Sequence, residues 1–214
     1  MNFGFLVFPG VEELDLIGPW EMITLWNKYA NGPDTCITIS ETSRIIECAK
    51  GIRLKPHATF SQCPRLDFLL VPGGEGTRKE VHNSRLMDFV AQKAGECRIV
   101  LSVCTGSFIL QKAGLLEGKK ATTHWASLDR LRKCGDVKVV EERIVRQGSV
   151  WTASGVSAGI DLALSLIQYI AGDEAAAIVQ MKAEYFPSRT MYGDFKNYKE
   201  APSYISGTDP DPEP

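Results

Sequence analysis

Cys104 is the residue with the clearest chemical potential in this sequence. It follows the apolar run Ile99–Val103, which predicts a buried strand, and a helical pattern begins directly after Cys104-Thr105-Gly106. A strand that turns sharply into a helix with a nucleophile at the turn is a nucleophile elbow. The partial positive charge of the helix N-terminus favours a thiolate there. The alternative is a small buried cysteine at a strand end, because free cysteine is often fully buried.

Asp15 is the candidate acid. It lies between Leu14 and Leu16 and is followed by Ile17-Gly-Pro19. A carboxyl flanked by leucines is either the N-cap of the first helix or a partly desolvated acid with a raised pKa. The sequence leaves both interpretations open.

Backbone donors are expected from two turns. Pro72-Gly73-Gly74 follows a predicted strand, and glycines let backbone N–H groups approach a reacting atom, as an anion hole requires. The N–H of Thr105 lies beside the predicted nucleophile. The alternative for Pro72-Gly73-Gly74 is a plain turn that ends the strand.

His124 and Trp125 are candidate substrate-binding residues after a short predicted strand. A lone histidine is either a structural hydrogen-bonding group or a participant in the chemistry. Trp125 belongs either to the core or to a pocket wall. No cysteine or histidine cluster has the spacing of a zinc site, so we expect no metal.

Strands alternate with helices along the chain. Apolar runs at 3–8, 67–71 and 99–103 and an alternating pattern at 35–39 predict strands. Helical spacing is found at 12–29, 84–96 and 156–170. This order predicts a single α/β domain, a doubly wound sandwich with a mostly parallel central sheet and helices on both faces. In such sheets the site lies at the carboxyl ends of the strands, where Asp15, Gly73 and Cys104 would meet.

Cap residues and boundaries complete this prediction. We expect Thr123 to cap a helix carrying Trp125, Ser154 to cap the helix over 156–170, and Gly172 to end it. The domain is predicted to span residues 1–186. Residues 187–214 form a C-terminal extension whose last six residues are predicted to be disordered.

The composition of the 214 residues is that of an ordinary globular protein, with a formal net charge of −2. That balance favours neither nucleic acid nor an anionic membrane surface as a partner. The six cysteines are scattered and no signal peptide is recognisable, so we expect reduced thiols and a cytoplasmic protein. No apolar stretch approaches the roughly 18 residues of a membrane span.

Four motifs together resemble the ThiJ/PfpI superfamily, whose members have a class I glutamine amidotransferase-like fold. They are Val71-Pro-Gly-Gly74, Ser102-Val-Cys-Thr-Gly-Ser107, the segment 114–125 and the segment 154–163. The resemblance implies Cys104 as nucleophile, Asp15 as its acidic partner, Gly74 as a backbone donor, Thr105 beside the nucleophile and His124 as the histidine after the elbow helix. It also implies a homodimer.

Within the superfamily, Leu14-Asp-Leu-Ile-Gly-Pro19 with Cys104-Thr105-Gly106 most resembles the isonitrile hydratases. This implies addition of water to a small isonitrile, giving an N-substituted formamide. The reaction would pass through a covalent Cys104 thioimidate, with Asp15 as general acid and base and with no cofactor.

Other functions of the superfamily stay open. Glyoxalase, deglycase, peptidase or amidase activity would depend on His124, which completes a triad in some members. A redox sensor is a further alternative, since a low-pKa thiol is easily oxidised. Relatives also include the sensory halves of transcription regulators, but we expect no DNA-binding domain in a chain of this length.

Overall fold

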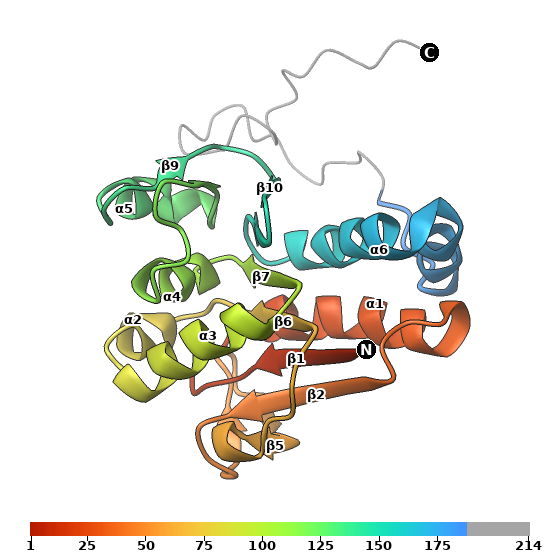
Figure 1. Ribbon diagram of the computed structural model, residues 1–214, viewed down its shortest axis with the longest axis horizontal. Helices are drawn as coiled ribbons and strands as arrows, with labels where there is room; N and C mark the ends of the chain where they lie inside the picture. The colour runs from red at the N-terminus through yellow and green to blue at the C-terminus, as the bar shows by residue number, and fades with distance from the viewer. Residues whose placement is uncertain (188–214) are drawn as a thin grey trace.

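The computed structural model describes residues 1–187, so most of the predicted extension at 187–214 lies outside the described residues (Figure 1). The main strands are β1 (Asn2–Leu6), β2 (Thr35–Ser40), β5 (Ala58–Thr59), β6 (Phe68–Val71), β7 (Ile99–Val103), β10 (Ile144–Gln147) and β11 (Val150–Ala153). The shorter strands are β3 (Ile46–Glu47), β4 (Arg53–Leu54), β8 (Lys120–Ala121) and β9 (Lys138–Val139). The helices are α1 (Glu13–Ala30), α2 (Thr77–Glu80), α3 (Ser84–Glu96), α4 (Gly106–Lys112), α5 (Leu128–Arg132) and α6 (Ala158–Lys182), with short 3-10 helices at Phe60–Gln62 and Trp125–Ser127.

Within the described chain, one seven-stranded sheet has the order β10-β11-β7-β6-β1-β2-β5. The pairs from β11 to β5 are parallel, and β10 joins β11 as an antiparallel hairpin. Gly148 lies at the hairpin turn with φ of 59°, a backbone conformation that suits glycine. The predicted α/β class with a mostly parallel sheet is confirmed.

Side chains of the central strands alternate between two hydrophobic cores. On β6, Leu70 packs in a core shared with Trp26 of α1 and Leu166 of α6. Its neighbour Leu69 packs in the opposite core with Phe89 of α3. Successive residues of a strand point to opposite faces, so a fully buried strand requires helices on both sides of the sheet. The prediction of helices on both faces is therefore also confirmed.

The helix α6 lies side by side with α1 over one face of the sheet (Figure 1). By length and composition α6 could cross a membrane, and it is the one such helix within residues 1–187. Its residues Leu162, Leu166, Ile167 and Val179 are buried in the core, as in the core helix of a globular domain. The span is also interrupted at Gly172, whose φ of 86° is not helical, so the predicted helix end there is confirmed.

Two predicted caps are wrong. The hydroxyl of Thr123 donates to the carbonyl of Cys104 at 2.9 Å instead of capping a helix. The cap at Trp125–Ser127 comes from His124, whose Nδ1 accepts from the N–H of Ala126 at 3.3 Å. Ser154 lies three residues before the N-cap position of α6, and its buried hydroxyl has no partner among the described residues. The backbone of Cys104 forms hydrogen bonds with the Thr123 hydroxyl and the Ser154 carbonyl, so local sequence patterns do not predict the caps in this region.

The direction of the strand connections reverses at β1. The chain passes from β1 to β2 on one side of β1 and later returns to place β6 and β7 on the other side. The loops that follow β1 and β6 therefore lie next to each other at the carboxyl edge of the sheet. Ligands bind at such a point in open α/β sheets. Asp15 follows β1 and Gly73 follows β6, so the fold brings these two residues together.

Candidate active site

The backbone at Cys104 is held in a conformation that few side chains adopt. Its φ is 56°, in the left-handed region. The Cys104 N–H donates to the carbonyls of Ser154 at 2.8 Å and Ala153 at 3.1 Å. The Cys104 carbonyl accepts from the hydroxyls of Thr123 at 2.9 Å and Ser107 at 3.2 Å. These bonds hold the strained turn, as is typical of a functional elbow.

Asp15 is a buried acid. It lies inside the first turn of α1 with no exposed surface, and the N-cap position belongs to Glu12. The interpretation of Asp15 as a helix cap is therefore wrong, and the desolvated acid is the correct one. The N–H of Gly73 donates to Asp15 Oδ2 at 2.9 Å, while Oδ1 has no partner among residues 1–187. Burial raises the pKa of Asp15 to about 7, although the hydrogen bond from the Gly73 N–H favours its ionised form.

The Cys104 thiol holds its proton more tightly than an exposed cysteine does. Burial, and next the negative charge of Asp15, raise the pKa of Cys104 to about 12. The N–H groups of Thr105 and Val156 lower the pKa but do not offset burial. The expected stabilisation of a thiolate by the helix N-terminus is thus wrong for the free protein. The lost solvation outweighs the dipole of α4, which has seven residues.

The Gly73-Gly74 turn positions other groups of the site. The N–H of Gly73 is used by Asp15, and the N–H of Gly74 donates to Thr105 Oγ1 at 3.0 Å. The Thr105 hydroxyl also accepts from Thr77 Oγ1 at 3.2 Å and donates to the carbonyl of Gly74 at 3.2 Å. A Cβ at position 73 would lie 2.5 Å from the Thr105 nitrogen, so this turn requires glycine. In this structure the N–H groups of Gly73 and Gly74 both donate to protein side chains. The sequence had instead suggested that they donate to a reacting atom.

A pocket of about 380 Å³ opens above Cys104. His124 lines it, and burial lowers the pKa of His124, so the ring is neutral near pH 7. Because Nδ1 accepts from Ala126, the ring proton lies on Nε2. Among residues 1–187, His124 has no hydrogen bond to Cys104 or Asp15. Trp125 is exposed and is absent from the pocket lining, so the expected pocket wall at Trp125 is wrong.

Sequence reasoning missed several residues of this pocket, among them two arginines and a strained valine. Arg78 comes from α2, Arg130 from α5, and Val156 from the segment before α6. Val156 has φ of 46°, which is rare for a β-branched residue, and its N–H reaches the Cys104 sulfur. Its place in the Ser154–Ala163 motif was the available clue. No local sequence pattern indicates Arg78 and Arg130, because they line one pocket only after the chain has folded.

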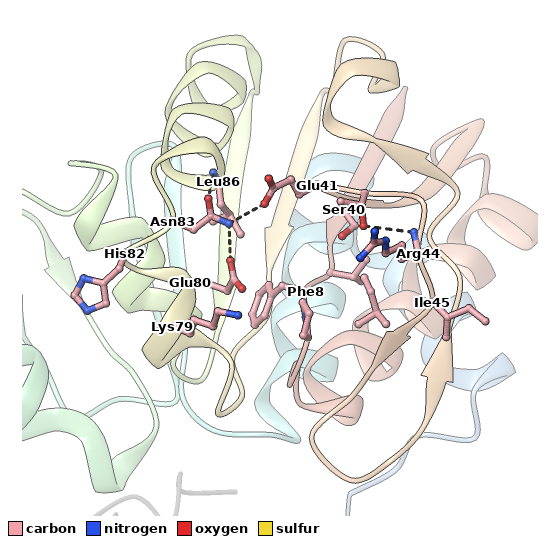
Figure 2. A pocket seen from close by; sticks show the side chains of 14 residues that line it. Phe8, Ser40, Glu41, Arg44, Ile45, Lys79, Glu80, His82, Asn83 and Leu86 are labelled. Carbon is pink, nitrogen blue, oxygen red and sulfur yellow. Dashed lines mark hydrogen bonds between the residues drawn. The ribbon is translucent and has the colours of Figure 1, made fainter.

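A larger pocket of about 520 Å³ lies elsewhere, between the ends of β1 and β2 and the start of α3. Figure 2 shows Asn83 between Glu41 and Glu80, and its amide donates to each carboxylate at 2.9 Å. The donated bonds from Asn83 and Arg85 lower the pKa of Glu41, so this carboxylate stays ionised. These contacts join the start of α3 to the segment after β2, and both carboxylates are already hydrogen-bonded within the protein. We place the chemistry at the smaller pocket instead, because an elbow nucleophile and a buried acid meet there.

The comparisons with known proteins agree with this geometry. Residues 2–169 match the DJ-1/PfpI family. Isonitrile hydratase from Pseudomonas putida is 41% identical over 189 residues, which cover 88% of this chain and 80% of that protein. The HTH-type transcriptional regulator GbdR from Pseudomonas aeruginosa is 29% identical over 83% of this chain, which spans only 49% of the regulator.

Among solved structures, a ThiJ/PfpI family protein from Pseudomonas syringae is similar with a TM-score of 0.83 and 32% identity. The likeness covers 96% of this chain and 82% of that one. The resemblance inferred from the sequence motifs is confirmed. The chain belongs to the DJ-1/PfpI family.

Proposed function

We propose that this protein adds water to an isonitrile and releases an N-substituted formamide, with Cys104 as the nucleophile and Asp15 as general acid and base. The observation that carries the proposal is the pairing of a buried thiol with a buried carboxyl, with no histidine bonded to either among the described residues. The 41% identity to isonitrile hydratase from Pseudomonas putida supports it.

The first step forms a carbon–sulfur bond. The sulfur of Cys104 attacks the terminal carbon of R–N≡C as Asp15 removes the thiol proton and delivers it to that carbon. The product is a thioimidate, R–N=CH–S–Cys104, and Asp15 is again a carboxylate. Asp15 suits this transfer because a pKa of about 7 lets it both accept and donate a proton near neutral pH.

The second step consumes water. Asp15 removes a proton from water as the oxygen adds to the thioimidate carbon, and it passes this proton to the nitrogen. The C–S bond of the adduct R–NH–CH(OH)–S–Cys104 then breaks, Asp15 transfers the hydroxyl proton of the adduct to the sulfur, and R–NH–CHO leaves. Isonitrile and water are thus the only reactants consumed, and the protein returns to its starting state.

A desolvated site suits a reacting group that bears no net charge. An isonitrile has an electrophilic carbon but no oxygen on which negative charge develops during attack. The first step therefore needs no oxyanion hole, in keeping with Gly73 and Gly74 amides that bind Asp15 and Thr105.

The test is turnover of 4-methylphenyl isonitrile, followed by NMR of the formyl proton of the product. Wild-type protein should form the formamide, and Cys104→Ala and Asp15→Asn should form none above the uncatalysed rate. Cys63→Ala is the matched control, because Cys63 lies outside the pocket. Full activity of Cys104→Ala or Asp15→Asn, or no turnover by wild-type protein, would refute the proposal.

We further propose a cytoplasmic homodimer that binds neither nucleic acid nor membrane. Leu14 and Ile17 of α1 are 40% and 46% exposed, and Ile52, whose N–H donates to Glu13, is 55% exposed. Apolar side chains grouped in this way are typical of a subunit interface. Sedimentation equilibrium should give twice the monomer mass, and Ile17→Glu should shift it toward the monomer.

A further inference from the structure

Two guanidinium groups line the pocket above Cys104. Arg78 lies on α2 and Arg130 on α5, so they approach from different elements. The Arg130 guanidinium is 3.9 Å from the ring centre of Phe108, which orients it. Within residues 1–187, neither side chain has an ion pair or a hydrogen bond. By contrast, Arg132 of the same short helix pairs with Asp129 at 2.6 Å. Arg130 is therefore held in position with its charge unpaired.

Nearby negative charges are few or already paired. Glu12 forms an ion pair with Lys50. Burial raises the pKa of Asp15, so that carboxyl is partly protonated near pH 7, and His124 is neutral there. Glu75 is the remaining carboxylate of the lining, and it is exposed. The described wall of the pocket thus carries two exposed arginines, Arg78 and Arg130, against one exposed carboxylate, Glu75.

We propose that the substrate is an isonitrile that carries a carboxylate on its organic substituent, bound by Arg130 and Arg78 while its isonitrile carbon faces Cys104. This inference rests on the proposed function and specifies its substrate class. A guanidinium presents two parallel N–H groups that match a carboxylate. The Nε2–H of His124 and the hydroxyl of Ser127 are further donors on the same wall.

The chemistry of the reacting group makes such an anchor useful. An isonitrile group bears no net charge and is small, so orientation has to come from the rest of the substrate. The volume of about 380 Å³ is at the small end of ligand pockets, which favours a compact isocyano acid.

The test compares isonitriles that differ only in charge. Isocyanoacetate and 4-isocyanobenzoate are each assayed beside their methyl esters, and the selectivity is the ratio of kcat/KM for acid and ester. Wild-type protein should favour the acids by roughly tenfold, the size expected for one charge-assisted hydrogen-bonded pair. The ratio should fall toward one in Arg130→Gln and in the double variant Arg78→Gln/Arg130→Gln. Arg130→Lys should keep part of it.

Arg132→Gln is the matched control, since Arg132 lies on the same helix outside the pocket and should keep the wild-type ratio. Circular dichroism establishes that each variant is folded. If the esters react as well as the acids, or if the double variant keeps the selectivity, the carboxylate site is refuted while the hydratase proposal stands. If no isonitrile of either kind reacts, both proposals are refuted.

Discussion

The N–H of Gly73 donates to Oδ2 of Asp15 at 2.9 Å and so joins the loop after β6 to the first turn of α1. This bond lies beside β1, where the direction of strand connection reverses. It fixes one carboxyl oxygen and leaves Oδ1 without a partner among the described residues. Asp15 is therefore held rigidly by one loop while it keeps an oxygen for proton transfer beside Cys104.

The raised pKa of Asp15 predicts a pH-dependent loss of stability. The group binds its proton up to about pH 7 in the folded protein but only up to about 3.8 when unfolded. The folded state thus holds more protons between these values, and the free energy of unfolding falls as pH rises through this window. Asp15→Asn cannot ionise, so the difference between its free energy of unfolding and that of wild type should grow in its favour by roughly 3 kcal/mol from pH 4 to pH 7.

Urea unfolding at pH 4, 5.5, 7 and 8 measures this difference. Asp88→Asn is the control, because Asp88 is exposed on α3 and its effect should not vary in this way. A difference between Asp15→Asn and wild type that is the same at every pH would contradict the assignment of a raised pKa to Asp15.

The same carboxylate should slow alkylation of Cys104. Its negative charge raises the pKa of the thiol, so Asp15→Asn should lower that pKa and increase the thiolate fraction at pH 8. We expect Cys104 to react with iodoacetamide several times faster in Asp15→Asn, as measured by peptide mass spectrometry over time. An unchanged or slower rate would show that Asp15 does not set the protonation of the thiol.

Turnover should depend on pH through Asp15. The reactive form has a thiol and an ionised carboxyl, so kcat/KM should rise about tenfold per pH unit below pH 7 and level off above it. An isonitrile without ionisable groups isolates this dependence, since its own charge does not change. A profile that is flat from pH 5 to pH 8 would exclude Asp15 as the base.

Gly73→Ala tests the close packing of the two loops. The added Cβ would lie 2.5 Å from the Thr105 nitrogen and 2.9 Å from Asp15 Oδ2, so the acid and the elbow must move apart. We expect a loss of stability of about 1–3 kcal/mol and of activity by roughly a hundredfold. Gly95→Ala is the matched control. A Cβ there meets no atom within 4 Å, and alanine favours the helix α3. Equal activity of the two variants would contradict the positioning role of Gly73.

The sequence alone predicted the fold class and the elbow because each leaves a strong local pattern. Runs of apolar residues predict β6 and β7, which are buried throughout in the structure, and the break at Cys104-Thr105-Gly106 predicts the turn. The motif resemblance, confirmed by the family match, added Asp15 to Cys104. That Asp15 is fully buried could not be read locally, because its burial depends on the loop after β6.

Other features of the site depend on groups that are distant in the chain. The expected thiolate at Cys104 failed because desolvation by the whole fold outweighs one short helix. Thr123 was expected to cap a helix, but it is drawn to the carbonyl of Cys104, 19 residues away. Arg78 and Arg130 share a pocket only after α2 and α5 have packed around the elbow.

Detection of the covalent intermediate tests the central claim most directly. Wild-type protein is mixed with excess 4-methylphenyl isonitrile, quenched in acid within milliseconds to seconds, digested and analysed by mass spectrometry. We predict an adduct with the mass of one isonitrile on the peptide that contains Cys104, formed and consumed at rates that account for formamide release. Turnover at the full rate with no adduct on Cys104 at any time point would contradict covalent catalysis by this residue.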